Sequence, residues 1–261
     1  MKPTRGRLRL LRGVKRFLYS QLYLRDFFMI MFGKSKPIVP FKVEASPPSV
    51  YWNFEILPEK VQDLERELGL PLPLKKIRML EGEDPRFYLT LNLYRVSGLA
   101  NGIRAEWSLF AEDPHNAKPR YLVVEATSDA RAVDSVDLLT EIGEISHELS
   151  GETLESFAVS ARGGRFSCTC NKVLGGKRVR AHPEWVEAND FIYWLTGICD
   201  RTFYDAGMAN ARIRQLDPSE YSISDDSFWG GLVDPTPRHV IVYDDAIEFA
   251  MSPWWNLDDI E

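Results

Sequence analysis

Alternating apolar and polar positions dominate the middle of the chain and predict strands. One run has Phe87, Leu89, Leu91 and Leu93 on one side and Tyr88, Thr90, Asn92 and Tyr94 on the other. After turn residues at 97–102, a second run has Ile103, Ala105, Trp107 and Leu109 on one side and Arg104, Glu106, Ser108 and Phe110 on the other. A period of two residues is typical of a strand, because successive side chains point to opposite faces. A third strand is predicted over about 120–127.

A hairpin and two C-terminal strands follow. Residues 155–161 and 165–171 flank Arg162-Gly163-Gly164, and glycine supplies the positive φ that a tight hairpin turn needs. Cys168 and Cys170 alternate with polar residues there, which favours buried thiols on one face. The remaining strands are predicted over 209–216 and 239–250, with the turn-rich segment 225–237 between them.

Four segments have helical periodicity. A basic amphipathic helix is predicted over 7–32, ended by Gly33, with Leu8, Leu11, Val14, Leu18 and Leu22 spaced among basic residues. A second helix begins at Pro58 and ends at Gly69, with an apolar stripe of Val61, Leu64 and Leu68. The other two helices are predicted over 134–149 and 183–195.

Strands outnumber helices, and short turns join neighbouring strands. This organisation favours a mostly β fold with peripheral helices, built as an antiparallel sheet or barrel, over a doubly wound α/β fold. We expect a basic N-terminal arm at 1–36, a Pro-rich linker at 37–57 and a single β domain at 58–261. One β domain of that length is common.

Charge is divided unevenly along the chain. Residues 1–36 hold ten Lys or Arg and one acid, Asp26, whereas the remainder holds 22 basic and 37 acidic residues. The arm therefore carries +9 and the body −15, and the negative body argues against nonspecific nucleic-acid binding. A basic amphipathic helix at 1–32 suits an anionic membrane surface or a partner protein, and docking on the chain's own acidic body stays open as an alternative.

The sequence predicts a cytoplasmic protein. Peripheral attachment to the inner membrane surface through the arm stays open. Arg25-Asp26 interrupts the longest apolar stretch, at 17–32, so a membrane span is not expected. The start lacks a secretory cleavage pattern, although an organellar transit peptide stays open. Three cysteines without a C-x-x-C pair predict neither a disulfide framework nor a zinc site.

Familiar catalytic motifs are absent from the sequence. There is no Gly-rich nucleotide loop, no H-E-x-x-H and no G-x-S-x-G. The four histidines are scattered without the spacing of metal ligands. We therefore expect no metal and no cofactor.

The most suggestive polar residues lie on the two central strands. Arg104 and Glu106 are two residues apart on one strand, so they share a face and can pair. Facing inward, the pair would be partly desolvated and could orient a carboxylate or carbonyl ligand. Facing outward, it would be a solvated surface pair of little energetic value. Alternation alone leaves both interpretations open.

Several segments together resemble acetoacetate decarboxylase-like proteins in their order and spacing. They are 57–74, 94–98 (Tyr-Arg-Val-Ser-Gly), 102–113, 121–126, 210–213 (Asn-Ala-Arg-Ile) and 237–242 (Pro-Arg-His-Val-Ile-Val). The resemblance covers about 50–255 and leaves the arm outside. It implies one curved antiparallel sheet of cone-like barrel form, with a ligand cavity and helices packed around it.

The sequence departs from that family at the residues that would carry its chemistry. The resemblance implies a Schiff-base lysine, activated by a neighbouring lysine, just after the strand at 121–126. This chain has Thr-Ser-Asp-Ala-Arg-Ala at 127–132, and no lysine occurs from Arg120 to Asn171. Residues 94–98 also lack the carboxylate that the resemblance implies. We expect the fold without imine-based decarboxylation.

The functional prediction is a cavity that binds a small organic ligand with an oxygenated head and an apolar body. Altered chemistry of a lyase-like or hydrolase-like kind is the first hypothesis, and a non-catalytic, membrane-peripheral carrier of a hydrophobic ligand is the alternative. A third hypothesis is an interaction subunit whose arm binds a protein partner. Assembly into a homo-oligomer stays open. The candidate catalytic residues are Arg104 and Glu106, and the candidate substrate-binding residues are Tyr88, Asn92, Tyr94 and Glu125.

Overall fold

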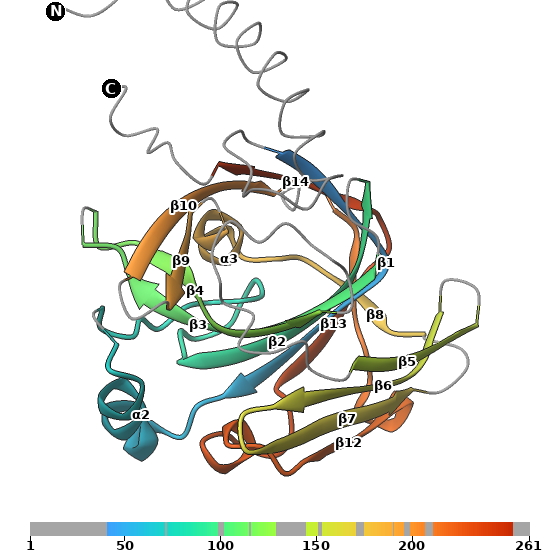
Figure 1. Ribbon diagram of the computed structural model, residues 1–261, viewed down its shortest axis with the longest axis horizontal. Coiled ribbons are helices and arrows are strands. Elements are labelled where there is room, and N and C mark those ends of the chain that lie inside the picture. Colours follow the sequence, from blue (N-terminus) through green and yellow to red (C-terminus); the bar gives the residue numbers. More distant parts are fainter. Residues whose placement is uncertain are drawn as a thin grey trace, which may run out of the picture.

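Strands make up most of the part of the chain that the structure describes. The computed structural model describes residues 41–70, 72–98, 102–114, 116–128, 145–150, 153–170, 175–189, 191–195, 199–206 and 211–252 (Figure 1). The basic helix expected over 7–32 lies outside these residues. Among them, no helix is long and apolar enough to cross a membrane.

Ten strands form the larger sheet. In hydrogen-bonded order they are β14 (Ile247–Ser252), β10 (Cys199–Ala206), β9 (Phe191–Leu195), β4 (Pro119–Ser128), β3 (Gly102–Glu112), β2 (Tyr88–Gly98), β1 (Phe41–Glu55), β13 (His239–Tyr243), β11 (Ile213–Gln215) and β8 (Lys177–Val179). Neighbours are antiparallel except β4 and β9, which are parallel. β14 also pairs with the first residues of β1, so the order of pairing returns to β1. The sheet curves around the short helix α3 (Pro183–Ala188; Figure 1).

Four antiparallel strands form a second sheet. They are β12 (Tyr221–Asp225), β7 (Gly164–Cys170), β6 (Thr153–Ala161) and β5 (Ile145–Ser150). The predicted hairpin of β6 and β7 is confirmed, and Gly163 takes φ +74° in its turn. Cys168 and Cys170 are buried free thiols on one face of β7, as predicted, with their sulfurs 3.8 Å apart.

Both faces of the central strands are buried. On one face, Leu89, Leu91 and Leu93 of β2 belong to the core between the two sheets, where Trp52 stacks on Phe157 with ring centroids 5.6 Å apart. On the other face, Tyr88 and Tyr94 belong to a second core, which includes Trp185 of α3. The predicted alternation of β2 and β3 is therefore confirmed, and the polar side does not face water.

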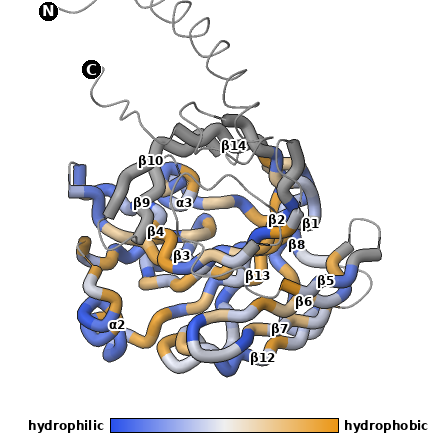
Figure 2. Tube along the Cα trace, in the orientation of Figure 1, coloured by the Kyte–Doolittle hydropathy of each residue, from blue (hydrophilic) through white to orange (hydrophobic). Residues whose placement is uncertain are grey.

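Short helices lie between the strands in the described sequence, and one of them, α3, lies inside the curve of the larger sheet (Figure 1). They are η1 (Pro58–Lys60), α2 (Val61–Leu68), α3 (Pro183–Ala188), η3 (Pro218–Glu220) and η4 (Trp229–Gly231). The helix predicted between Pro58 and Gly69 is confirmed: α2 buries Val61 and Leu64, its exposed side is hydrophilic (Figure 2), and Gly69 ends it at φ +59°. In α3, the His182 side chain caps the first turn and Trp185 is buried.

The segment expected as a linker is mostly a strand. Residues 41–55 of the predicted linker, 37–57, form β1, which pairs with β2, β13 and β14. Pro47 and Pro48 stand where the pairing with β2 shifts register, between Ser46 and Val50. Proline donates no hydrogen bond to a sheet and is tolerated at such an irregularity. The prolines therefore mark a break within a strand, and the linker prediction was wrong for these residues.

Other element predictions also need correction. The helix expected over 183–195 ends at Ala188, and Phe191–Leu195 forms β9, whose aromatic and β-branched residues favour a strand. The end of the helix expected over 134–149 belongs to β5, while 134–144 lies outside the described residues. The strand expected over 239–250 is two strands, β13 and β14, separated by a turn at 244–246. β11 covers Ile213–Gln215 of the strand expected over 209–216, of which residues 209 and 210 are not described.

Candidate functional site

Four polar side chains meet where β2 and β3 pair, on the face that the curved sheet turns toward α3. In the register of the two strands, Tyr94 lies opposite Arg104 and Asn92 lies opposite Glu106. Directly opposed side chains on one face of an antiparallel pair are about 5 Å apart. The local alternation of each strand and the pairing between them therefore bring these four predicted residues together.

Glu106 is the centre of this group. Arg104 Nε donates to Glu106 Oε1 over 2.5 Å, and the Tyr94 hydroxyl donates to the same oxygen over 2.9 Å. Asn92 Nδ2 donates to the other oxygen, Oε2, over 3.3 Å. We name these four residues the Glu106 cluster. Both carboxylate oxygens are thus held by donors from two strands.

Burial decides between the two interpretations that the sequence left open. Arg104 is 3% exposed and Glu106 is 6% exposed, so the solvated surface pair is excluded. Removing two charges from water is costly, and close pairing with additional hydrogen bonds offsets that cost. Burial, and then the charge of Glu106, raises the pKa of Tyr94 well above its ordinary value. Tyr94 therefore stays a neutral phenol that can donate a hydrogen bond.

Further polar and aromatic side chains continue from the cluster toward α3. Thr90 donates to Asn53 Oδ1 over 2.9 Å. Trp185 Nε1 donates to the Tyr121 hydroxyl over 3.3 Å, and its ring lies edge-on to that of Tyr51, 5.9 Å away.

Sequence reasoning missed Asn53, Tyr51, Tyr121 and Trp185. They come from β1, β4 and α3, and the signal that joins them is strand pairing over long sequence distances. The alternate positions of Tyr51 and Asn53 on β1 were an available signal. It was hidden because this segment was interpreted as a linker.

Tyr88 does not join the Glu106 cluster. It shares a face with Asn92 and Tyr94, but six residues of strand separate it from Tyr94, about 20 Å at ordinary strand spacing. Its ring lies 6.1 Å from that of His239, and burial raises the pKa of its hydroxyl. Alternation places residues on a face and says nothing about how far apart they are along it.

Glu125 lies on the opposite face of the sheet. It pairs with Trp107, and its Oε2 accepts a hydrogen bond from Trp229 Nε1 over 2.6 Å, in the core between the two sheets. The register of β3 and β4 shifts between Trp107 and Ser108, which leaves Val124 as an extra residue in β4. A bulge of one residue reverses the alternation beyond it. Tyr121 and Val123 therefore face α3, and Glu125 does not.

Three lysines make contacts outside the Glu106 cluster. Lys75 forms an ion pair with Glu112, Lys118 forms one with Glu187 at 2.8 Å, and Lys76 lies over the ring of Phe87 at 5.4 Å. Among the residues that the structure describes, no group of three or more His, Cys, Asp or Glu could hold a metal ion. The cluster offers a guanidinium, a carboxylate, a phenol and an amide. These groups can orient and polarise an oxygenated ligand and can exchange a proton with it.

Comparisons with known proteins bear on the fold. The chain is similar to a solved structure of acetoacetate decarboxylase, with a TM-score of 0.52 and 10% identity over 85% of this chain and 90% of the other. It is also similar to acetoacetate decarboxylase from Legionella pneumophila subsp. pneumophila strain Philadelphia 1, with a TM-score of 0.51 and 9% identity over 84% of this chain and 87% of the other. No protein-family model and no curated protein sequence matches it. The resemblance is confirmed for the fold: this chain has a mostly β fold of the acetoacetate decarboxylase kind.

Proposed function

We propose that this chain is an acetoacetate decarboxylase-like protein that binds a small organic molecule with an oxygenated head and an apolar body. The Glu106 cluster would hold the head, with Arg104 and Glu106 in contact with it and Tyr94 and Asn92 orienting it. The observation that carries the proposal is the buried ion pair of Arg104 and Glu106, held by Tyr94 and Asn92 from the neighbouring strand.

A ligand-binding role explains the presence of a buried ion pair better than a gain in stability does. Apolar residues of similar volume often stabilise a core as well as a buried ion pair does, or better. Charged groups desolvated beside specific partners occur preferentially where ligands bind or react. The Glu106 cluster contains such desolvated charged groups, and the chain that holds it has a fold similar to that of a decarboxylase.

The enclosing cavity is part of the proposal. The pairings run from β1 through β2, β3, β4, β9, β10 and β14 and back to β1. We propose that these seven strands close into a cone-like barrel and that the ligand enters it beside Arg104. A closed barrel buries both faces of its strands, which agrees with the burial of both faces of β2 and β3.

The proposed chemistry differs from that of an imine-forming decarboxylase. The segment from Arg120 to Asn171 contains no lysine, and Lys75, Lys76 and Lys118 make contacts outside the cluster. Arginine cannot replace the amine, because it stays protonated. We therefore propose lyase-like or hydrolase-like chemistry in which Arg104 polarises a carbonyl or carboxylate and Glu106 transfers a proton.

Native mass spectrometry of the purified full-length protein tests the proposal. We expect wild-type protein to retain a small organic molecule that Arg104→Ala and Glu106→Gln lose. Glu125→Gln is the matched control, since Glu125 is a buried carboxylate on the opposite face and its variant should keep the molecule. The molecule would then be isolated and returned to the protein. Its conversion would identify an enzyme, and its recovery unchanged would identify the carrier of the alternative hypothesis.

Circular dichroism must show that each variant is folded before its mass is interpreted. Glu106→Gln preserves the shape of the side chain and is the variant of choice if Arg104→Ala fails to fold. Retention of the molecule by folded Glu106→Gln, or its equal loss from Glu125→Gln, would contradict the assignment of the site to the Glu106 cluster.

A further inference from the structure

A cavity of about 710 Å³ lies at the β8 edge of the larger sheet, separate from the Glu106 cluster. It is bounded by β8, by β11 with the two residues before it, and by the chain at 80–83. The Glu81 amide donates to the Arg180 carbonyl over 3.1 Å, and Leu80 forms a bridge with Ala181, so backbone pairing holds the two walls together. Its volume is in the range of about 300–1,000 Å³ that small-molecule sites occupy.

The floor of this cavity is apolar. Leu80 and Ile213 are 6% and 4% exposed, and both belong to the core that includes Trp185. Val179 and Ala211 pack partly buried against the same core. An apolar floor continuous with a core is a rigid surface on which the carbon skeleton of a ligand can rest.

The rim of the cavity is basic. Lys177, Arg178 and Arg180 line it and are exposed. Among the described residues, no ion pair engages these three side chains. Cationic side chains around one opening raise the local positive potential, and this potential favours an anion there.

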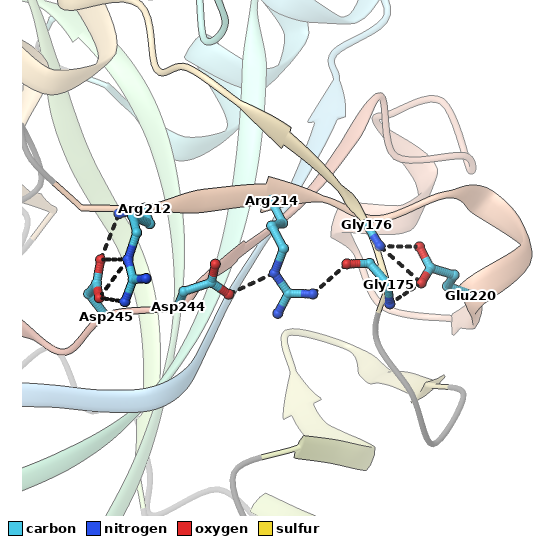
Figure 3. Close-up of polar contacts among 7 residues, drawn as sticks. All are labelled: Gly175, Gly176, Arg212, Arg214, Glu220, Asp244 and Asp245. Atoms are coloured by element: carbon cyan, nitrogen blue, oxygen red, sulfur yellow. Dashed lines mark hydrogen bonds and ion pairs between the residues drawn. The ribbon is translucent and has the colours of Figure 1, made fainter.

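Arg212 is held in place at the same rim. Its Nε and Nη2 donate to the Asp245 carboxylate, and its backbone amide donates to Asp245 Oδ2 over 2.9 Å (Figure 3). These contacts lower the pKa of Asp245 to about 2, so the carboxylate stays charged. The neighbouring Arg214 donates hydrogen bonds to the Asp244 carboxylate and to the Gly175 carbonyl. Arg212 is therefore oriented before any ligand arrives.

The charges favour a phosphate over a carboxylate as the ligand's anionic group. Four cationic side chains line the cavity against two carboxylates, Glu81 and Glu83, and Asp245 offsets one cation from outside the lining. One arginine satisfies both oxygens of a carboxylate, whereas a phosphate monoester carries three acceptor oxygens and a charge near −2. Several guanidinium groups around one opening match the three oxygens and the charge of a phosphate monoester.

We propose that this cavity binds a small organic phosphate monoester. The phosphate lies at the rim among Arg178, Arg180, Lys177 and Arg212, and the organic part rests on Leu80, Val179 and Ile213. The site is independent of the Glu106 cluster and would make the protein responsive to a second molecule besides the ligand proposed above.

Isothermal titration calorimetry of the full-length protein with phenyl phosphate tests this proposal. Phenyl phosphate supplies both the dianion and an apolar body, inorganic phosphate supplies only the anion, and phenol supplies only the body. We expect phenyl phosphate to bind more tightly than either fragment and to bind less tightly as salt is added. The double variant Arg178→Gln/Arg180→Gln should weaken its binding at least tenfold, because two charge-assisted contacts are lost.

Two matched variants make the result specific. Arg66→Gln removes an exposed arginine on α2, far along the chain from the cavity, and should leave the affinity unchanged. Glu106→Gln should also leave it unchanged, which separates this site from the one in the proposed function. Equal affinity in wild type and Arg178→Gln/Arg180→Gln, the absence of phenyl phosphate binding at millimolar concentration, or a loss confined to Glu106→Gln would each overturn the proposal.

Discussion

Arg104 and Glu106, two residues apart on β3, form an ion pair inside the protein, with arginine Nε 2.5 Å from glutamate Oε1. Little of either side chain reaches bulk water that could replace its partner, because the two side chains are 4% and 9% exposed. Each charge therefore depends on the other for its stabilisation. Either both charges remain together or the survivor is left in a poorly solvating environment.

Replacing Arg104 with alanine should lower the free energy of unfolding by about 3–5 kcal/mol, because it leaves the Glu106 carboxylate without its cation. Urea denaturation at neutral pH measures this change. The control is Arg66→Ala: Arg66 pairs with Asp63 on the surface of α2, and its side chain is 78% exposed. That variant should change stability by less than about 0.5 kcal/mol. Equal effects of the two substitutions would contradict the burial of the pair.

Glu125 and Trp229 should behave as a structural pair. Burial raises the pKa of Glu125, so its carboxylate is poorly solvated, and Glu125→Gln keeps an oxygen that can accept from Trp229. We expect Glu125→Gln to change stability by less than about 1 kcal/mol. Trp229→Phe removes the donor from a buried acceptor and should cost about 1–3 kcal/mol. Thermal or urea unfolding measures the stability of both variants. A larger loss of stability for Glu125→Gln than for Trp229→Phe would contradict this prediction.

His239 should make the protein less stable as the pH falls from about 6.5 to about 4. Burial, followed by the charges of Arg238 and Arg86, lowers the pKa of His239 to about 4, although Glu83 Oε1 lies 3.0 Å from Nε2. The unfolded chain takes up a proton near pH 6.5 and the folded chain only near pH 4. The stability that His239 contributes is thus present above pH 6.5 and lost through this window, up to about 3 kcal/mol.

Urea unfolding of wild type and His239→Gln at pH 7.5, 6, 5 and 4 isolates this contribution, because the other titrating groups cancel in the difference between the two proteins. The variant should lose less stability across the window than wild type does. Parallel curves would show that His239 takes up its proton equally readily in both states.

No lysine should form an imine with a β-keto acid or a β-diketone. We expect borohydride treatment in the presence of acetoacetate or acetylacetone to leave the intact mass unchanged, since the segment expected to hold the nucleophile has no lysine. The first positions to inspect by peptide mapping are Lys75, Lys76, Lys118 and Lys172. A stoichiometric adduct on any single lysine would contradict the proposed chemistry.

Residues 1–32 should bind anionic membranes. Their charge and apolar stripe favour attachment at the interface, strengthened by acidic lipids and weakened by salt. Co-sedimentation with vesicles that contain about 30% phosphatidylserine should exceed that with neutral vesicles, and deletion of 1–36 should abolish the difference. Equal sedimentation of full-length and shortened protein would favour the alternative in which the arm docks on the acidic body.

Local patterns predicted the central part of the fold. The alternation in β2 and β3 follows from the pleat of a strand, and Gly163 and Gly69 act where a turn and a helix end need positive φ. The same alternation placed Arg104 and Glu106 on one face. These features depend on a few neighbouring residues, so they could be predicted without knowledge of the rest of the chain.

Elements whose conformation depends on distant partners were harder to predict. The aromatic run of β9 is compatible with a helix or a strand, and its parallel pairing with β4 decides for the strand. Pro47 and Pro48 suggested a linker, but pairing with β2, β13 and β14 makes the segment a long strand with an irregularity.

The sequence by itself determined that Arg104 and Glu106 lie side by side, because two residues of strand return a side chain to the same face. Only the tertiary structure decided that this face is buried, because burial depends on the curvature of the sheet and on α3, which comes about 80 residues later. It also decided that Glu125 faces the other way. The bulge in β4 is a property of the pairing with β3, and a single extra residue reverses which side of the sheet the rest of a strand presents.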